Sequence, residues 1–180
     1  MYKLTIINIS NIDKLKKQKL VAFENFIKEL NKYWDNNDTF KNLIDRLKKR
    51  KMYNYYYIFL SHNEKIIGGF RYFKKNIEDK ILFNRFVYKN GTYYHIQEVF
   101  VINGYRGKGI LDKLFKYFFH NIGKNKKCIL AVDKENKFGI KAYERNKFKK
   151  IIERKVTNKI LDNNIYSEKF TEYLMLVKSY

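Results

Sequence analysis

The stretch GYRGKGILDKLF, residues 104–115, places three glycines within six positions of a chain that has only 8 glycines in 180 residues. Arg106 and Lys108 lie between these glycines, and an apolar helix pattern begins directly after them. Because glycine is unfavourable in helices, such a cluster at a helix entrance indicates a backbone shaped for close approach. One interpretation is a loop whose amides bind an anion at the positive end of the helix dipole. The other is a tight turn between a strand and a helix, and the stretch alone leaves both open.

The chain before this stretch begins with a strand and two helices. Apolar and polar residues alternate along residues 2–9, as they do in a half-buried strand. A helix signal follows at Ser10, and Asp38 is placed to cap a second helix. Apolar side chains recur at helical spacing at Phe23, Phe26, Ile27, Leu30 and Trp34 in the first helix and at Phe40, Leu43, Ile44 and Leu47 in the second. We therefore expect two amphipathic helices.

Aromatic and β-branched runs then predict strands, at residues 53–62, 65–73, 81–88 and 92–102. The first two runs are joined by Asn63 and Glu64, which indicates a hairpin. The last two flank Asn90 and Gly91, and Asn-Gly is a strong hairpin signal. Adjacent hairpins predict antiparallel strand pairs.

The chain after the stretch alternates between helix and strand patterns. Leu111, Leu114, Phe115 and Phe118 form an apolar stripe on the helix that follows the loop. A strand near 128–132, a helix at about 137–146, and strands near 148–155 and 172–178 complete the order. The two late strand-to-helix steps predict parallel crossovers. We therefore expect an α/β fold, with a mixed central sheet of about six to seven strands and helices on both faces, in a single domain over residues 1–180.

Composition excludes several classes of protein. The chain is 45% hydrophobic and 18% aromatic, which is too apolar for a disordered protein. It has no run of about 18 apolar residues, so we expect no transmembrane helix and no membrane partner. Cys128 is the only cysteine, which excludes an internal disulfide and predicts a reducing, cytoplasmic compartment. We expect Cys128 to be a buried strand residue, and no His, Cys or carboxylate grouping has the spacing of a metal site.

The net charge of +21 suggests a nucleic-acid partner at first sight. Only seven of the 39 basic residues are arginine, however, and proline is absent, while Lys, Asn, Ile, Tyr and Phe dominate. These abundant residues have A/T-rich codons, so a biased genome accounts for the charge without selection for a basic surface. Strand alternation also buries many of the aromatic rings that would otherwise stack on bases. We therefore do not expect a nucleic-acid partner, although the charge favours any anionic ligand.

Residues 99–115, VFVINGYRGKGILDKLF, resemble the acetyl-CoA signature of the Gcn5-related N-acetyltransferase (GNAT) superfamily, whose loop reads Arg/Gln-x-x-Gly-x-Gly/Ala. The residues that fit this pattern are Arg106, Gly107, Lys108, Gly109 and Ile110. Leu111 departs from it, because the family prefers glycine or alanine there. Leu111 also begins the apolar stripe of the following helix, which gives the departure a local reason.

Residues 135–148, ENKFGIKAYERNKF, resemble a second GNAT motif, a helix that begins after Asn and carries Ala and Tyr before a strand. Asn136, Ala142, Tyr143 and Phe148 take the recognisable positions. Two motifs in the family's order are more specific than either alone. The chain is closest in motif to the branch that resembles diamine acetyltransferases.

The resemblance implies a GNAT-like fold and an acetyl-CoA-dependent N-acetyltransferase that moves an acetyl group from the thioester to a primary amine by direct attack. It implies that the strand before the loop pairs with the pantetheine arm and that one strand amide polarises the thioester carbonyl. It implies that the loop amides bind the pyrophosphate. The implied cofactor-binding residues are Val99, Phe100, Val101, Arg106, Gly107, Lys108, Gly109, Ile110, Leu111, Asp112, Asn136 and Tyr143.

The resemblance also implies catalytic residues. Tyr143 matches the family's acid, which protonates the leaving thiolate. The related diamine branch has two adjacent acidic residues on the preceding strand, and here this pair reads Gln97-Glu98. Glu98 is therefore the first candidate base and His95, acting through water, the second, while a base supplied by solvent stays open. Each side chain also has a purely structural interpretation: packing for Tyr143, a helix cap for Asn136, a surface carboxylate for Glu98 and a structural histidine for His95.

Two other functions stay open beside the acetyltransferase. A non-catalytic CoA-binding relative is suggested by Gln97 and Leu111, and a basic nucleic-acid-binding module by the charge. The acceptor is expected to be a small-molecule or peptide amine. A basic surface disfavours a polycation such as spermine. A homodimer is left open.

Overall fold

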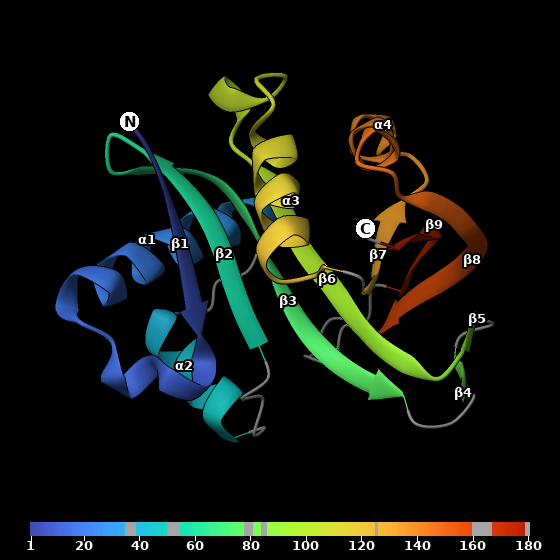
Figure 1. Ribbon diagram of the computed structural model, residues 1–180, viewed down its shortest axis with the longest axis horizontal. Coiled ribbons are helices and arrows are strands. Elements are labelled where there is room, and N and C mark those ends of the chain that lie inside the picture. The colour runs from blue at the N-terminus through green and yellow to red at the C-terminus, as the bar shows by residue number, and fades with distance from the viewer. Residues whose placement is uncertain are drawn as a thin grey trace. The chain divides into compact units, whose positions relative to one another are not determined.

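The computed structural model describes residues 1–34, 39–49, 55–77, 81–83, 86–124, 126–159 and 167–178. The strands are β1 (Tyr2–Asn8), β2 (Tyr55–His62), β3 (Lys65–Ile77), β4 (Ile81–Phe83), β5 (Phe86–Tyr88), β6 (Gly91–Val101), β7 (Lys127–Asp133), β8 (Lys149–Lys159) and β9 (Ser167–Lys178). The helices are α1 (Lys17–Trp34), α2 (Phe40–Lys49), α3 (Ile110–Asn121) and α4 (Lys137–Arg145), with the 3-10 helices η1 (Ile9–Lys14) and η2 (Asn103–Tyr105) (Figure 1). This is the order of elements that the sequence predicts, except for the two 3-10 helices and for the two strands β4 and β5 where one strand was expected at 81–88.

Seven strands form one mixed sheet in the order β1-β2-β3-β6-β7-β9-β8, and β4 pairs only with β5 in a separate two-stranded sheet. The pairs β1–β2, β2–β3, β7–β9 and β8–β9 are antiparallel. The consecutive strands β6 and β7 are joined through α3. The predicted fold class, a mixed sheet of six to seven strands with a GNAT-like order, is confirmed.

The chain forms two compact units, one of Met1–Lys74 with Ile96–Phe118 and the other of Lys75–His95 with Phe119–Tyr180. The expected single domain over residues 1–180 stays a prediction. Asp38, the expected cap of α2, lies outside the described residues, as do residues 53 and 54 of the expected strand. At this point the Thr39 hydroxyl oxygen accepts from the Asn42 amide at 3.1 Å. Within the described ranges, no helix combines the length and the apolarity that a membrane span requires.

The first unit has helices on both faces of its strands. Phe26 of α1 packs on Phe59 with ring centroids 4.7 Å apart. Phe115 of α3 packs on Phe70 with ring centroids 5.4 Å apart. In the β2–β3 register Ile58 pairs with Phe70, so Phe70 and Phe59 point to opposite sides of the strands. The aromatic runs of the sequence are therefore mainly core. Figure 1 shows helices on either side of β2 and β3.

One predicted hairpin is confirmed and the other is wrong. Asn63 and Glu64 turn β2 into β3 with φ values of 47° and 63°, the left-handed conformation of a tight hairpin turn. Residues 81–88, in contrast, do not form one strand that pairs with 92–102. They divide into β4 and β5, which pair with each other, while β6 enters the large sheet beside β3. An Asn-Gly signal reports a local turn, and here pairing within the preceding run overrides it.

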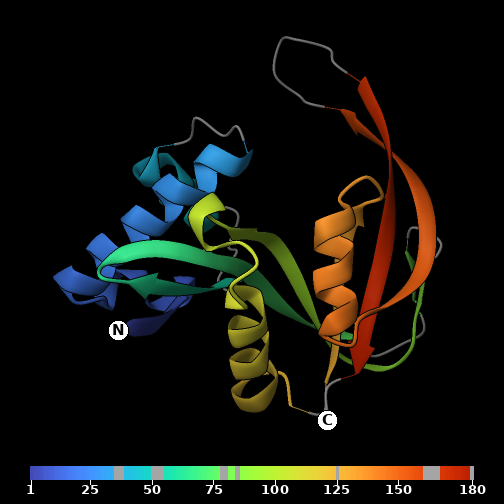
Figure 2. The same cartoon turned by 90° about the horizontal axis from the view of Figure 1, so that it is seen from above.

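The second unit is built on the β7, β9 and β8 strands, with the long β8–β9 ribbon and α4 visible in Figure 2. Its core includes Ile77, Tyr93, Ile129 and Leu174. Cys128 is 0% exposed in β7, so its prediction as a buried strand residue is confirmed. Burial raises the pKa of its thiol to about 12.

Candidate functional site

The loop between β6 and α3 is held by its own backbone and by one arginine. The Tyr105 amide donates to the Ile102 carbonyl at 2.9 Å, and the Arg106 amide donates to the Asn103 carbonyl at 3.2 Å. Arg106 Nε also donates to the Val101 carbonyl at 3.1 Å. Arg106 therefore fastens the start of the loop to the end of the strand.

Gly107 and Gly109 take φ values of +75° and +69°, which side-chain-bearing residues rarely adopt. A Cβ on Gly107 would meet no atom within 4 Å, so the space above this residue is open. A Cβ on Gly109 would meet only Asp112 Oδ2, at 3.7 Å. The glycines are therefore required by backbone conformation and not by crowding from neighbouring atoms.

Helix α3 begins directly after the loop, and its first turn carries the acidic residue Asp112. The Lys113 amide donates to the Gly109 carbonyl at 3.0 Å, and the amides of the preceding first turn face the end of the helix. Ile110 is 1% exposed and Leu111 is half-buried. The expectation that Leu111 begins the buried stripe is therefore wrong, because Ile110 fills that place one residue earlier. The loop and α3 together present backbone amides at a helix amino end, which is the type of arrangement that can bind an anion.

Strand β6 is interrupted just before the loop. Glu98 has a φ of +52°, which is uncommon for a residue other than glycine and indicates a bulge. Phe100 buries its ring in the core, 5.4 Å from the ring of Phe26 between centroids, so only its backbone is available to a ligand. Val99 and Val101 are half-buried on either side of it.

Gly68 of β3 permits a close approach that sequence reasoning did not find. A Cβ at this position would lie 2.8 Å from the Phe100 carbonyl oxygen. It would also lie 3.2 Å from a methyl group of Ile110, at the start of α3. The only sequence signal is the Gly-Gly pair inside an otherwise apolar strand.

Glu98 is paired with an arginine that sequence reasoning also did not find. Arg71 Nη2 lies 2.7 Å from Glu98 Oε1 and donates to Gln97 Oε1 at 3.0 Å. Burial raises the pKa of Glu98, and Arg71 acts against this rise. Arg71 is the only charged residue in the run GGFRYF, and this is the sequence signal that could have identified it.

His95 belongs to the second unit. Burial lowers its pKa to about 4, and the positive charge of Lys75 acts in the same direction. The imidazole is therefore neutral at pH 7.

Asn136 and Tyr143 belong to the second unit and lie on α4. Asn136 Oδ1 accepts from the Gly139 amide at 2.8 Å, so Asn136 is the N-cap of the helix. A Cβ on Gly139 would lie 2.7 Å from Asn136 Nδ2, which explains the glycine. Tyr143 is 6% exposed and packs edge-on against Phe148, and burial raises its pKa.

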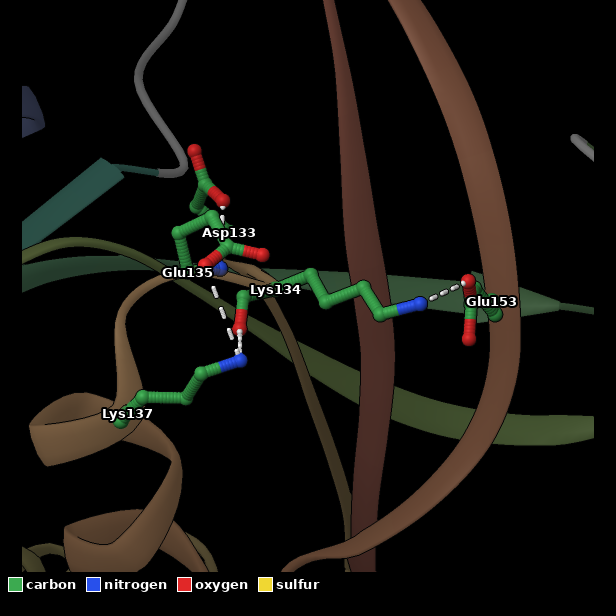
Figure 3. A network of polar contacts seen from close by, with 5 residues as sticks. All are labelled: Asp133, Lys134, Glu135, Lys137 and Glu153. Carbon is green, nitrogen blue, oxygen red and sulfur yellow. Dashed lines mark hydrogen bonds and ion pairs between the residues drawn. The ribbon is translucent and has the colours of Figure 1, made fainter.

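A network of polar contacts holds the turn that leads into α4 (Figure 3). Lys134 Nζ lies 2.7 Å from Glu153 of β8, and the Lys134 carbonyl accepts from Lys137 Nζ at 3.0 Å. The Glu135 amide donates to Asp133 Oδ1 at 2.8 Å. These contacts fix the turn on both sides of the Asn136 cap.

The candidate residues thus fall into two sets. The first unit brings together Glu98, the end of β6, the glycine loop and the start of α3. The second unit contains His95, Asn136 and Tyr143. Among the described residues, no group of His, Cys, Asp or Glu side chains is arranged to hold a metal ion.

Several solved structures resemble the chain. Spermidine N-acetyltransferase from Vibrio cholerae, in complex with CoA and spermine, matches at 15% identity with a TM-score of 0.56 over 99% of this chain and 95% of its own. NAA60 from Arabidopsis thaliana, in complex with a bisubstrate analogue, matches at 16% identity with a TM-score of 0.60 over 98% and 97%. The ribosomal-protein-S5-alanine acetyltransferase from Vibrio fischeri matches at 18% identity with a TM-score of 0.60 over 99% and 93%. At these identities the likeness shows a shared fold.

The sequence itself identifies the family. No curated protein shows significant similarity to the chain. Residues 23–148, which are more than half of its length and include the loop, match the Acetyltransferase (GNAT) family. The chain therefore belongs to the GNAT family of acetyltransferases.

Proposed function

We propose that the protein is an acetyl-CoA-dependent N-acetyltransferase in which a primary amine attacks the thioester directly. The observation that supports this most is the loop at residues 106–109, where two glycines with positive φ lead into the amino end of α3. When bound, acetyl-CoA supplies the acetyl group as an activated thioester.

The loop and the strand before it bind the donor. We expect the pyrophosphate to lie beside Gly107 and to accept from backbone amides between Gly107 and Asp112, except that of Lys108, which already donates to the Tyr105 carbonyl at 3.4 Å. Lys108 adds positive charge, and Asn136 is the remaining binding residue suggested by the second motif. This arrangement fits an anion because it combines helix-end amides with a net charge of +21.

The strand end orients the thioester. The positive φ of Glu98 indicates a bulge in β6, and the backbone of Val99, Phe100 and Val101, which follows this bulge, binds the pantetheine arm. The Val101 carbonyl also accepts from Arg106. An amide of this segment polarises the thioester carbonyl.

Glu98 accepts the proton of the attacking amine. A free alkylammonium has a pKa of about 10.4, so a base is needed at neutral pH. Burial raises the pKa of Glu98, which makes it a stronger base than an exposed glutamate. His95, acting through water, is the second candidate, and its pKa of about 4 makes it the weaker base.

Tyr143 donates its proton to the leaving thiolate. The hydroxyl is protonated at neutral pH, as an acid must be, although burial raises its pKa and so makes it a weaker acid than an exposed tyrosine. The role rests on the position of Tyr143 in the second motif.

The acceptor is a small-molecule or peptide amine. Relatives of similar fold act on spermidine and on ribosomal protein S5, by their names. Repulsion by a chain of charge +21 favours an acceptor that is not a polycation.

Isothermal titration calorimetry with acetyl-CoA tests the proposal, and we expect saturable binding with micromolar affinity. Gly109→Val should abolish this binding with the fold retained, because a β-branched residue does not adopt a φ of +69°. Gly104→Ala is the matched control, since a Cβ there meets no atom within 4 Å. Normal acetyl-CoA binding by the Gly109 variant would show that the loop is only a turn between the strand and the helix.

A non-catalytic CoA-binding protein is the second candidate, and it is favoured by Gln97, where the related branch has an acidic residue, and by Leu111, where the family prefers glycine or alanine. A panel of amines distinguishes the two functions. Acetylated product from any amine establishes catalysis, whereas binding without product from the whole panel supports the second candidate.

A further inference from the structure

The Arg71–Glu98 pair lies in the first unit between β3 and the interrupted part of β6. The two side chains are 17% and 26% exposed, and their charged atoms are 2.7 Å apart. The same guanidinium nitrogen donates to Gln97, so one cation holds two adjacent side chains of β6. The guanidinium carbon also lies 4.9 Å from the centre of the Tyr55 ring.

Stability alone does not explain this pair. Removing two charges from water costs several kcal/mol per ion, and their attraction offsets this only with good geometry. Glu98 additionally has a φ of +52°, a conformation that costs on the order of 1–3 kcal/mol in a residue other than glycine. A strained residue that carries a largely buried carboxylate, at the end of the strand that leads into the donor loop, indicates a functional constraint.

We propose that Arg71 is a positioning residue for Glu98. Arg71 holds the Glu98 carboxylate in one orientation and keeps this carboxylate ionised until it accepts the proton of the acceptor amine. This rests on the proposed function of Glu98 as the base. The hydrogen bond from Arg71 to Gln97 fixes the guanidinium, so Gln97 has a role as its anchor where the related branch has a second acidic residue.

The charges around Glu98 decide how its ionisation responds to Arg71. Burial is the largest influence and raises the pKa of Glu98. Arg71 of β3 lowers it, and Arg46 of α2 lowers it further with a smaller effect. Tyr55 and Tyr57 of β2 face the same pair, and burial raises the pKa of Tyr57 to about 12, so both hydroxyls are neutral near pH 7. Loss of the Arg71 charge should therefore raise the pKa of Glu98.

The test is a ¹³C carboxyl NMR titration of Glu98, assigned by the signal that disappears in Glu98→Gln. In Arg71→Met we expect the midpoint to move to higher pH. Arg71→Lys, which keeps the cation, should stay near the parent. Arg46→Met is the graded control and should give a smaller rise. If packing were the role of Arg71, methionine and lysine would give the same midpoint.

Kinetics supply the functional readout with a good acceptor. The acid limb of kcat/KM should move to higher pH in Arg71→Met, with about a tenfold loss on that limb for each unit of the move, and Arg71→Lys should restore it. Should Arg71→Met not fold, Arg71→Gln carries the same expectation, because it keeps a polar side chain at this position and loses the charge.

Two results would overturn the proposal, and they are distinguishable. An unchanged Glu98 midpoint in a folded Arg71→Met or Arg71→Gln variant contradicts the role of Arg71 and needs no acceptor to measure. Full activity of Glu98→Gln contradicts the assignment of the base. Failure to bind acetyl-CoA, in contrast, would contradict the proposed function and leaves the NMR result standing.

Discussion

Tyr143 has a buried hydroxyl, and Tyr143→Phe removes only its proton-donating group while the ring stays packed against Phe148. If this hydroxyl protonates the leaving thiolate, kcat should fall by roughly 10²–10⁴, with little change in acetyl-CoA affinity. The loss should appear equally in kcat and kcat/KM, because the interaction is made mainly in the transition state. Steady-state kinetics with a good acceptor measure both values.

A tyrosine that only packs would behave differently. Tyr143→Phe would then turn over at the parental rate, and only Tyr143→Ala would lose activity through the cavity it creates. An unchanged kcat in the Phe variant would remove Tyr143 from the mechanism and leave the family assignment in place.

His95 should make the protein sensitive to mild acid. The unfolded chain binds a proton on this imidazole below about pH 6.5, whereas the folded protein does so only near pH 4. Stability that is complete above pH 6.5 is therefore lost as the pH falls towards 4, by on the order of 3 kcal/mol in total and about 2 kcal/mol between pH 7 and pH 5. Urea denaturation of His95→Gln at pH 7 and pH 5 should show a smaller loss than the parent shows.

His120→Gln is the control for this measurement, because His120 is exposed on α3. It should keep the parental loss between pH 7 and pH 5. Equal losses in the parent and in His95→Gln would show that other groups cause the acid sensitivity.

Among single residues, those that belong to a family motif could be predicted from the sequence. Those whose role depends on contacts with other strands could not. Glu98 was found from the motif, but its positive φ and its pairing with Arg71 depend on a strand 26 to 27 residues away. Gly68 was missed for the same reason, because its need for glycine comes from Phe100 on another strand. Contacts between distant segments leave little trace in local spacing.

At the carboxyl end of α4, one residue is of a type that is unfavourable for the backbone conformation it adopts. The Phe148 amide donates to the Tyr143 carbonyl at 3.0 Å and the Lys147 amide donates to the Glu144 carbonyl at 2.9 Å, which is the Schellman pattern. Its left-handed position is occupied by Lys147, with a φ of +69°. Lys147→Gly should therefore stabilise the fold by about 1 kcal/mol in urea denaturation.

Lys141→Gly tests whether this gain is specific to the helix end. Lys141 is exposed in the body of α4, where glycine should destabilise by about 1 kcal/mol. The two Lys→Gly variants thus have opposite expected signs on one helix, and the same sign for both would contradict the explanation from φ.

Element order was predictable because periodicity changes visibly between helices and strands along the chain. The pairing of strands was less predictable from the sequence. The Asn63-Glu64 hairpin joins two strands that are both long, whereas 81–88 is long enough to pair with itself as β4 and β5. A local turn signal does not show which of several possible strands will pair with one another.

For the whole molecule, a net charge of +21 should accelerate the encounter with an anionic donor. Stopped-flow binding of acetyl-CoA should show an association rate that falls by about tenfold between 10 and 150 mM salt, as the screening length shortens. Binding of uncharged pantetheine is the control and should change little. A flat rate for acetyl-CoA would mean that the charge lies too far from the site to matter.

The one thiol of the chain has a practical consequence. Cys128 is 0% exposed, and burial raises its pKa to about 12, so it is neither accessible to a thiol reagent nor ionised at assay pH. In the proposed reaction each turnover releases CoA, whose thiol reacts rapidly with a colorimetric disulfide reagent. The folded protein should therefore contribute no background to a continuous assay of that kind. The same reagent, left long enough without substrate, would instead report how often the second unit opens, because labelling of Cys128 has to wait for that event.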